Sequence, residues 1–167
     1  SKYLSQSSNV ELMRVMPNTS SRFSKGITAI YNISASESTQ KKVALLFKKV
    51  GIILEMQKES HMDDFTGLIG SGPAYFFFLL QVYEKRIMNI YNINKKKNNL
   101  IISNLLDGVS KSIGSGETIE ALIKAVASKK GTTEAGIKSF QSSQVLKSFD
   151  KGIAAAIKRS KEISSEF

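Results

Sequence analysis

The sequence has no cysteine, no tryptophan, two prolines and one histidine among its 167 residues. The lack of cysteine excludes disulfides, cysteine nucleophiles and thiolate zinc sites. Because His61 is the only histidine, a histidine-based metal cluster cannot form within the chain, and we expect no metal. The first residues show no signal-peptide pattern, so we expect a cytoplasmic protein. They also lack an initiating methionine, and we expect that the chain begins in mid-protein.

Long apolar runs are absent as well. The longest run, from Ala74 to Val82, is well below the roughly 18 residues that suggest a membrane span. A run of this length is typical of a buried helix or of a helix–helix interface. We therefore expect no membrane contact.

Positive charge is abundant but dispersed. The net charge is +10, and the tightest basic run, Lys95–Lys97, is flanked by asparagines. A helical nucleic-acid binder would need a clustered cationic face, which the sequence does not show. We therefore expect no nucleic-acid partner.

Residues 9–57 alternate between strand and helix patterns. Either Ser36 or Ser38 can cap a helix that Gly51 terminates. A sheet this small is incomplete by itself, which predicts the last strands and helix of a larger α/β domain. The predicted strands are Val10–Met16, Gly26–Ile33 and Ile52–Met56.

From about Glu59 onward the pattern is helical. Residues 92–99 have low complexity and are predicted to form a loop. The boundary between the two regions falls near residue 58, which gives predicted domains of residues 1–58 and 59–167. The predicted helices cover residues 62–91 with an interruption at 70–73, then 100–114, 118–127, 133–140 and 144–164.

A turn rich in glycine and hydroxyl groups, Ser128–Thr133, leads directly into a predicted helix. The N–H groups of Gly131, Thr132 and Thr133 would be free there and could hold a carboxylate, helped by the helix dipole. The hydroxyl of Ser128 can add a hydrogen bond. By itself this segment is more typical of an ordinary capped helix.

Two other segments have the composition of binding turns. Gly70–Tyr75 fits equally well a closely packed helix restart and a helix N-terminus that faces an anion or a carboxamide. Asn18 follows Met16 and Pro17 at the end of a strand, where open α/β sheets hold ligands. A plain turn is the more frequent explanation of Pro-Asn.

Taken together and in this order, the three segments resemble the pyrroline-5-carboxylate reductase family. The resemblance implies an α/β remnant, the last strands and helix of a Rossmann-type domain, followed by an all-α dimerisation domain. It also implies an oxidoreductase of proline biosynthesis. The matching residues are Arg14–Thr19, Glu59, Met62, Asp63, Thr66, Gly70–Tyr75, Ser128–Thr133, Asp150, Ala155 and Arg159–Glu162.

The sequence departs from the family pattern in several places. Lys129 and Lys130 stand where the family has Pro-Gly, and Ser20 replaces a proline. If that glycine has a positive φ, Lys130 costs on the order of 1–3 kcal/mol of strain. The Rossmann fingerprint G-x-G-x-x-G is absent, so the units that bind the pyrophosphate are missing. We therefore do not expect this chain alone to turn over.

The resemblance implies the roles of individual residues. The amides of Gly131, Thr132 and Thr133 would hold the carboxylate of 1-pyrroline-5-carboxylate, with Ser128 assisting. The hydroxyl of Thr133 would contact the ring nitrogen, so the predicted catalytic residues are Thr133 and Ser128. The residues predicted near the nicotinamide of NADPH or NADH are Met16, Pro17, Asn18 and Thr19.

The resemblance further implies a homodimer or a larger homo-oligomer, built through the helical region. The apolar stretch from Phe76 to Leu80 suits a helix that is buried on most sides. The main alternative from another class is a non-catalytic helical oligomerisation module, which would fold and associate without dinucleotide affinity.

Overall fold

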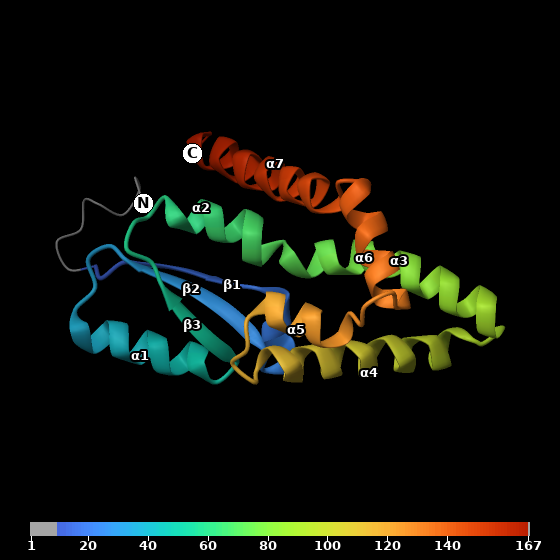
Figure 1. Ribbon diagram of the computed structural model, residues 1–167. Helices are drawn as coiled ribbons and strands as arrows, with labels where there is room; N and C mark the ends of the chain where they lie inside the picture. The colour runs from blue at the N-terminus through green and yellow to red at the C-terminus, as the bar shows by residue number, and fades with distance from the viewer. Residues whose placement is uncertain (1–9, 167) are drawn as a thin grey trace. The chain divides into compact units, whose positions relative to one another are not determined.

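The computed structural model describes residues 10–166 (Figure 1). The described chain forms two compact units: residues 10–75 with 151–166, and residues 76–150. The elements of the first unit are β1 (Met13–Pro17), η1 (Thr19–Phe23), β2 (Gly26–Asn32), α1 (Glu37–Lys48), β3 (Gly51–Glu55), α2 (His61–Phe65) and the π-helix η2 (Thr66–Gly70). Helix α3 (Gly72–Tyr91) leads into the second unit, which contains α4 (Lys95–Ile113), α5 (Ile119–Val126) and α6 (Thr132–Ser142). Helix α7 (Val145–Ser165) then returns to the first unit.

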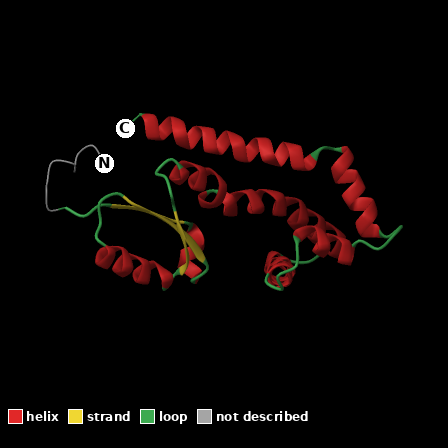
Figure 2. Ribbon diagram, turned by 60° about the vertical axis from the view of Figure 1, so that its left-hand side comes forward, coloured by secondary structure: helices red, strands yellow, loops and turns green. Residues whose placement is uncertain are grey.

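The sheet of the first unit has the strand order β1-β2-β3 (strands drawn yellow in Figure 2). Strand β1 runs antiparallel to β2, with Val15 opposite Ile30, while β2 and β3 are parallel and joined through α1. The three predicted strands and the helix between them are therefore confirmed, with boundaries shifted by one to three residues.

Helices cover both faces of this sheet. Ile30 of β2 and Ala44 of α1 line the same small cavity, so α1 lies against the face to which Ile30 points. Because side chains alternate along a strand, the neighbouring Ala29 points to the opposite face. There Ala29 is buried against Met62 and Phe65 of α2. The order of layers in the first unit is α1, sheet, α2 with η2, and then the end of α7 (Figure 1).

The ends of α1 follow from its capping residues. The hydroxyl of Ser36 accepts a hydrogen bond from the Thr39 N–H, so Ser36 rather than Ser38 is the N-cap. The C-cap is Lys49, and Gly51 is already the first residue of β3. The prediction that Gly51 terminates this helix is thus correct only to within two residues.

The predicted interruption is present but lies earlier than residues 70–73: the π-helix η2 widens the backbone between α2 and α3, and α3 already begins at Gly72. Wider turns leave carbonyl groups without their usual partners. The Tyr75 hydroxyl donates to the Gly67 carbonyl over 2.7 Å, and the Ser71 N–H donates to the Thr66 carbonyl over 2.9 Å. These two bonds satisfy carbonyls that a continuous α-helix would have bonded itself.

Helix α4 corrects one prediction. Residues 95–99 are its first helical residues and not part of a loop, because Asn94 is an N-cap whose side chain accepts from the Lys97 N–H over 2.9 Å. The low-complexity composition concealed this cap. The Thr118 cap predicted for the next helix is confirmed by its bond to the Ala121 N–H.

Apolar side chains of the second unit are largely exposed. Phe77 and Phe78 of α3 are 68% and 71% exposed within the chain, so the single chain does not provide the burial predicted for this helix. By length and composition alone, residues 61–91 would suffice to cross a membrane, a criterion that helices of soluble proteins also meet. Further exposed apolar residues of this unit are Phe76, Val82, Ile90, Leu100, Leu105, Val109, Ile113, Ile119, Val126, Phe140 and Leu146.

One polar side chain of the second unit is buried without hydrogen-bond partners among the described residues. Asn98 of α4 is fully buried, and neither Oδ1 nor Nδ2 has a hydrogen-bond partner among the described residues. Replacing a buried, unpaired amide by an apolar group of similar shape removes a desolvation penalty. We predict that Asn98→Leu raises the free energy of unfolding by about 1 kcal/mol.

The measurement is urea unfolding at one fixed protein concentration, since association contributes to apparent stability. Asn94→Ala, which removes the cap four residues earlier, is the matched control and lowers stability by about 1 kcal/mol. A loss of stability in Asn98→Leu would mean that the amide is satisfied after all.

Candidate functional site

The predicted cofactor residues form the turn at the end of β1. Asn18 is buried, its Oδ1 accepts from the Ile27 N–H over 3.1 Å, and its own N–H donates to the Ile27 carbonyl. Its side chain therefore joins the end of β1 to the start of β2. The Asn18 Nδ2 has no acceptor within residues 10–166 and is free to donate elsewhere. Pro17 and Thr19, on either side, are exposed.

Met16 has a different environment from its neighbours in this turn. Its sulfur lies 2.9 Å from the Thr66 hydroxyl, which is also 2.7 Å from the Met62 carbonyl. Its methyl group lies 3.5 Å from where a Cβ on Gly70 would stand. The side chain of Met16 therefore packs against η2, unlike those of its exposed neighbours Pro17 and Thr19.

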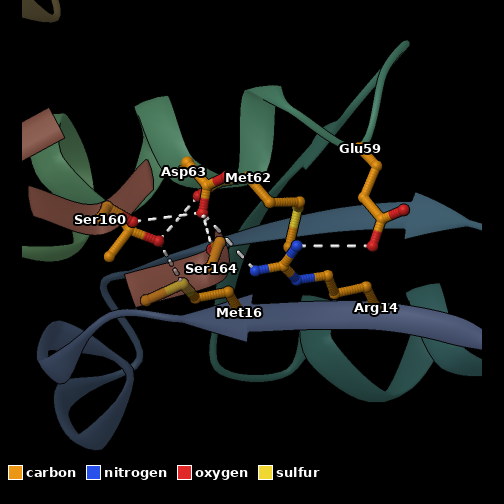
Figure 3. A network of polar contacts seen from close by, with 8 residues as sticks. Arg14, Met16, Glu59, Met62, Asp63, Ser160 and Ser164 are labelled. Carbon is orange, nitrogen blue, oxygen red and sulfur yellow. Dashed lines mark hydrogen bonds and ion pairs between the residues drawn. The ribbon is translucent and has the colours of Figure 1, made fainter. Parts of the chain in front are cut away.

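A buried carboxylate supports the strand that carries this turn (Figure 3). Asp63 Oδ1 accepts from the hydroxyls of Ser160 and Ser164 over 3.2 and 2.5 Å, and lies 3.8 Å from Arg14 Nη2. Arg14 also approaches Glu59, with 3.5 Å between Nη1 and Oε1. Strand β1, helix α2 and the last turns of α7 are thus held to one another through Asp63.

Close packing accompanies these bonds. A Cβ added to Gly67 would stand 2.5 Å from the Ile157 nitrogen, so only glycine lets η2 and α7 approach this closely. Four residues further along α7, Lys161 pairs with Asp64 over 2.7 Å at the surface. The adjacent carboxylates of Asp63 and Asp64 therefore reach different residues of the same helix.

The predicted substrate residues form the turn into α6, in the second unit. Gly131 is the N-cap and makes no side-chain capping bond, and the first bond of the helix runs from the Ala135 N–H to the Gly131 carbonyl over 3.2 Å. The N–H groups of Thr132 and Thr133 consequently have no acceptor in the part of the chain that the structure describes. Together with the helix dipole, these groups suit a carboxylate.

The turn before α6 is tight. The Gly131 N–H donates to the Ser128 carbonyl over 2.9 Å, so the prediction that this N–H is free is wrong. A Cβ on Gly131 would stand 2.3 Å from Ser128 Oγ. Lys130 has φ = 60°, the left-handed region that favours glycine. The expected strain is therefore present, and a side chain in this region costs about 1–2 kcal/mol.

The two groups of predicted residues belong to different compact units. Met16–Thr19 lie in the first unit and Ser128–Thr133 in the second. Within its own unit, each group has hydrogen-bonding atoms that the fold leaves unused: Asn18 Nδ2 in the first, and the Thr132 and Thr133 amides in the second.

Comparison with known proteins now bears on this arrangement. Residues 59–163 match the family described as "Pyrroline-5-carboxylate reductase dimerisation". This match covers more than half of the chain. The chain belongs to the pyrroline-5-carboxylate reductase family. The resemblance found in the sequence motifs is confirmed.

Curated relatives agree with the family match. The chain is 38% identical over 157 residues to pyrroline-5-carboxylate reductase 1 of Bacillus spizizenii, covering 93% of this chain and 52% of that protein. It is 31% identical over 156 residues to a pyrroline-5-carboxylate reductase of Pseudomonas aeruginosa, covering 93% of this chain and 57% of that one. The chain thus spans somewhat more than half the length of these reductases.

Solved structures give the same result for the fold. A pyrroline-5-carboxylate reductase from Coxiella burnetii superposes with a TM-score of 0.84 at 27% identity, over 96% of this chain and 59% of that one. The Plasmodium falciparum enzyme, solved with NADP bound, gives 0.79 at 25% identity, over 93% and 59%. The predicted fold class, a short mixed sheet followed by the helical region of this reductase family, is confirmed. The roles of the individual site residues stay predictions.

Sequence reasoning missed the role of one site-supporting residue. Asp63 and Asp64 have the pattern of charges in the first turn of a helix, yet Asp63 is buried and bonded to α7. Ser160 is the residue that could have indicated this role of Asp63, because it belongs to the family motif near the end of the chain.

We predict that Asp63→Ala lowers the free energy of unfolding by about 2–4 kcal/mol, because the variant leaves a guanidinium and two hydroxyls without their shared acceptor. Urea unfolding measures the effect. The neighbouring Asp64→Ala is the matched control and costs about 0–1 kcal/mol, since it removes only a surface ion pair. Equal losses in the two variants would contradict the role assigned to the buried carboxylate.

Proposed function

We propose that this chain is part of an NAD(P)H-dependent reductase that converts 1-pyrroline-5-carboxylate to proline. The observation that carries the proposal is the free N-terminus of α6, where the Thr132 and Thr133 amides have no acceptor within the described chain. Family membership supports the choice of a cyclic imine carboxylate as the ligand.

In this proposal the turn Ser128–Thr133 binds and orients the substrate. The free amides of Thr132 and Thr133 hold its carboxylate beside Gly131, and Ser128 adds a hydroxyl from the exposed side of the turn. The Thr133 hydroxyl, half-buried beside them, donates to the ring nitrogen or accepts from its proton. Holding the ring at both ends fixes the imine carbon in one orientation, which is how an enzyme lowers the entropic part of the barrier.

The β1 turn fits one end of a nicotinamide cofactor. Asn18 Nδ2 can donate to a carboxamide oxygen, and the exposed Pro17 and Thr19 can contact a ring. A bound NADPH or NADH supplies the hydride of the reduction. The sequence holds no glycine-rich phosphate fingerprint, so within this chain only the nicotinamide end has candidate residues.

We further propose that two copies associate through the apolar surface of the second unit. Its side chains of α3, α4 and α5 are too exposed for a stable unit in water, and an exposed apolar surface of this extent marks an interaction site. The description of the matched family as a dimerisation domain favours a second copy as the partner.

In the protein at its natural length, we predict that Thr133→Ala lowers kcat/KM for pyrroline-5-carboxylate by about a hundredfold, because it removes a positioned hydrogen bond to the reacting ring. Steady-state kinetics with NADPH and with NADH measure the change. Ser139→Ala, which removes an exposed hydroxyl from the same helix, leaves kcat/KM unchanged. A Thr133→Ala variant whose kcat/KM equals that of the wild type would refute the assignment.

Association can be tested separately. We predict that light scattering at micromolar concentration gives at least twice the mass of one chain. Replacing Phe77 and Phe78 together by Asp yields monomers, because two carboxylates are then placed in the apolar contact. Phe23→Asp, at a phenylalanine that is 67% exposed in the first unit, is the matched control and leaves the dimer intact. A monomeric wild-type protein would contradict the proposed association.

A further inference from the structure

The turn before α6 is tied to its own helix by one side chain. The Lys130 N–H donates to Glu134 Oε2 over 2.5 Å, and Lys138 Nζ lies 2.9 Å from Glu134 Oε1. Glu134 is the third residue of the helix and reaches back across its first turn, as in a capping box. The acceptor it supplies is placed before Gly131, the N-cap, which has no capping side chain itself.

This bond holds the backbone at its least favourable point. Lys130 has φ = 60°, which a lysine adopts only when its surroundings impose it. The peptide that Glu134 holds joins Lys129 to Lys130, directly before the amide of Gly131. The Gly131 N–H is held separately by the Ser128 carbonyl. If the Lys130 peptide were free to rotate, the turn that leads to the Thr132 and Thr133 N–H groups would lose one of its two hydrogen bonds.

The charge of Glu134 would by itself oppose a carboxylate ligand. The side chain of Glu134 is 30% exposed, and its hydrogen bond with Lys138, together with the one from the Lys130 N–H, lowers the pKa of Glu134 below its usual value. The group is therefore ionised at neutral pH. The ammonium of Lys138, four residues further along the same helix face, compensates this charge. The free amides can therefore still attract another anion.

We propose that Glu134 is a positioning residue of the carboxylate site: it fixes the Lys130 peptide so that the free Thr132 and Thr133 amides point to one ligand, while Lys138 cancels its charge. This inference rests on the proposed function. Glu134 contacts no substrate atom and acts through the turn. Lys138 prevents the positioning carboxylate from repelling the ligand.

The test compares the affinity of the natural-length protein for L-proline, measured by calorimetric titration in the wild type and in three variants. Glu134→Ala removes the acceptor and weakens proline binding about tenfold, the loss expected for one charge-assisted hydrogen bond. Glu134→Gln keeps an acceptor oxygen and restores binding to within about twofold of the wild type. Lys138→Gln weakens binding about two- to threefold at low salt, and added salt removes the difference.

A kinetic readout separates positioning from general loss of structure. In Glu134→Ala the KM for pyrroline-5-carboxylate rises while the KM for the nicotinamide cofactor stays unchanged. Equal proline affinity in Glu134→Ala and the wild type would overturn the role of Glu134 and leave the proposed function standing. A wild-type protein that binds no proline would overturn the proposed function itself, and this inference with it.

Discussion

The first unit depends on one buried carboxylate. Asp63 is 8% exposed and receives hydrogen bonds from Ser160 and Ser164, which lie 97 and 101 positions later in the chain. The same oxygen faces Arg14, whose strand ends in the turn of Asn18. Because the carboxylate is withdrawn from water, it requires all of these partners, and their bonds fix β1, α2 and the last turns of α7 together.

The second unit has the opposite character. It has hydrogen-bonded caps at Asn94 and Thr118 and regular helices, yet most of its apolar side chains face outward. Local capping therefore specifies where its helices begin, and the burial that would stabilise them must come from outside the single chain. The matched family region is named for dimerisation, which supports the association proposed above for this exposed surface.

Much of this could be predicted from the sequence, because the cues are local. Ser36 and Thr118 cap helices through bonds to residues three positions away, and alternating apolar residues indicate the strands. The start of α4 was missed since its cap, Asn94, lies in a run of asparagines and lysines. The role of Asp63 was missed because its partners are distant in sequence and no spacing relates them; only the motif residue Ser160 could have indicated it. The strain at Lys130 could be predicted only from the resemblance, because the family has a glycine at this position. The structure shows it as φ = 60°.

The central claim is that the free amides at the start of α6 serve a reductase acting on a cyclic imine carboxylate. It is tested most directly on the protein purified from its natural source, by measuring pyrroline-5-carboxylate-dependent oxidation of NADPH and NADH together with the intact mass of the same sample. The account predicts oxidation that requires both the imine and the protein. A folded, dimeric natural protein without this activity would contradict it and leave a non-catalytic oligomerisation module as the function.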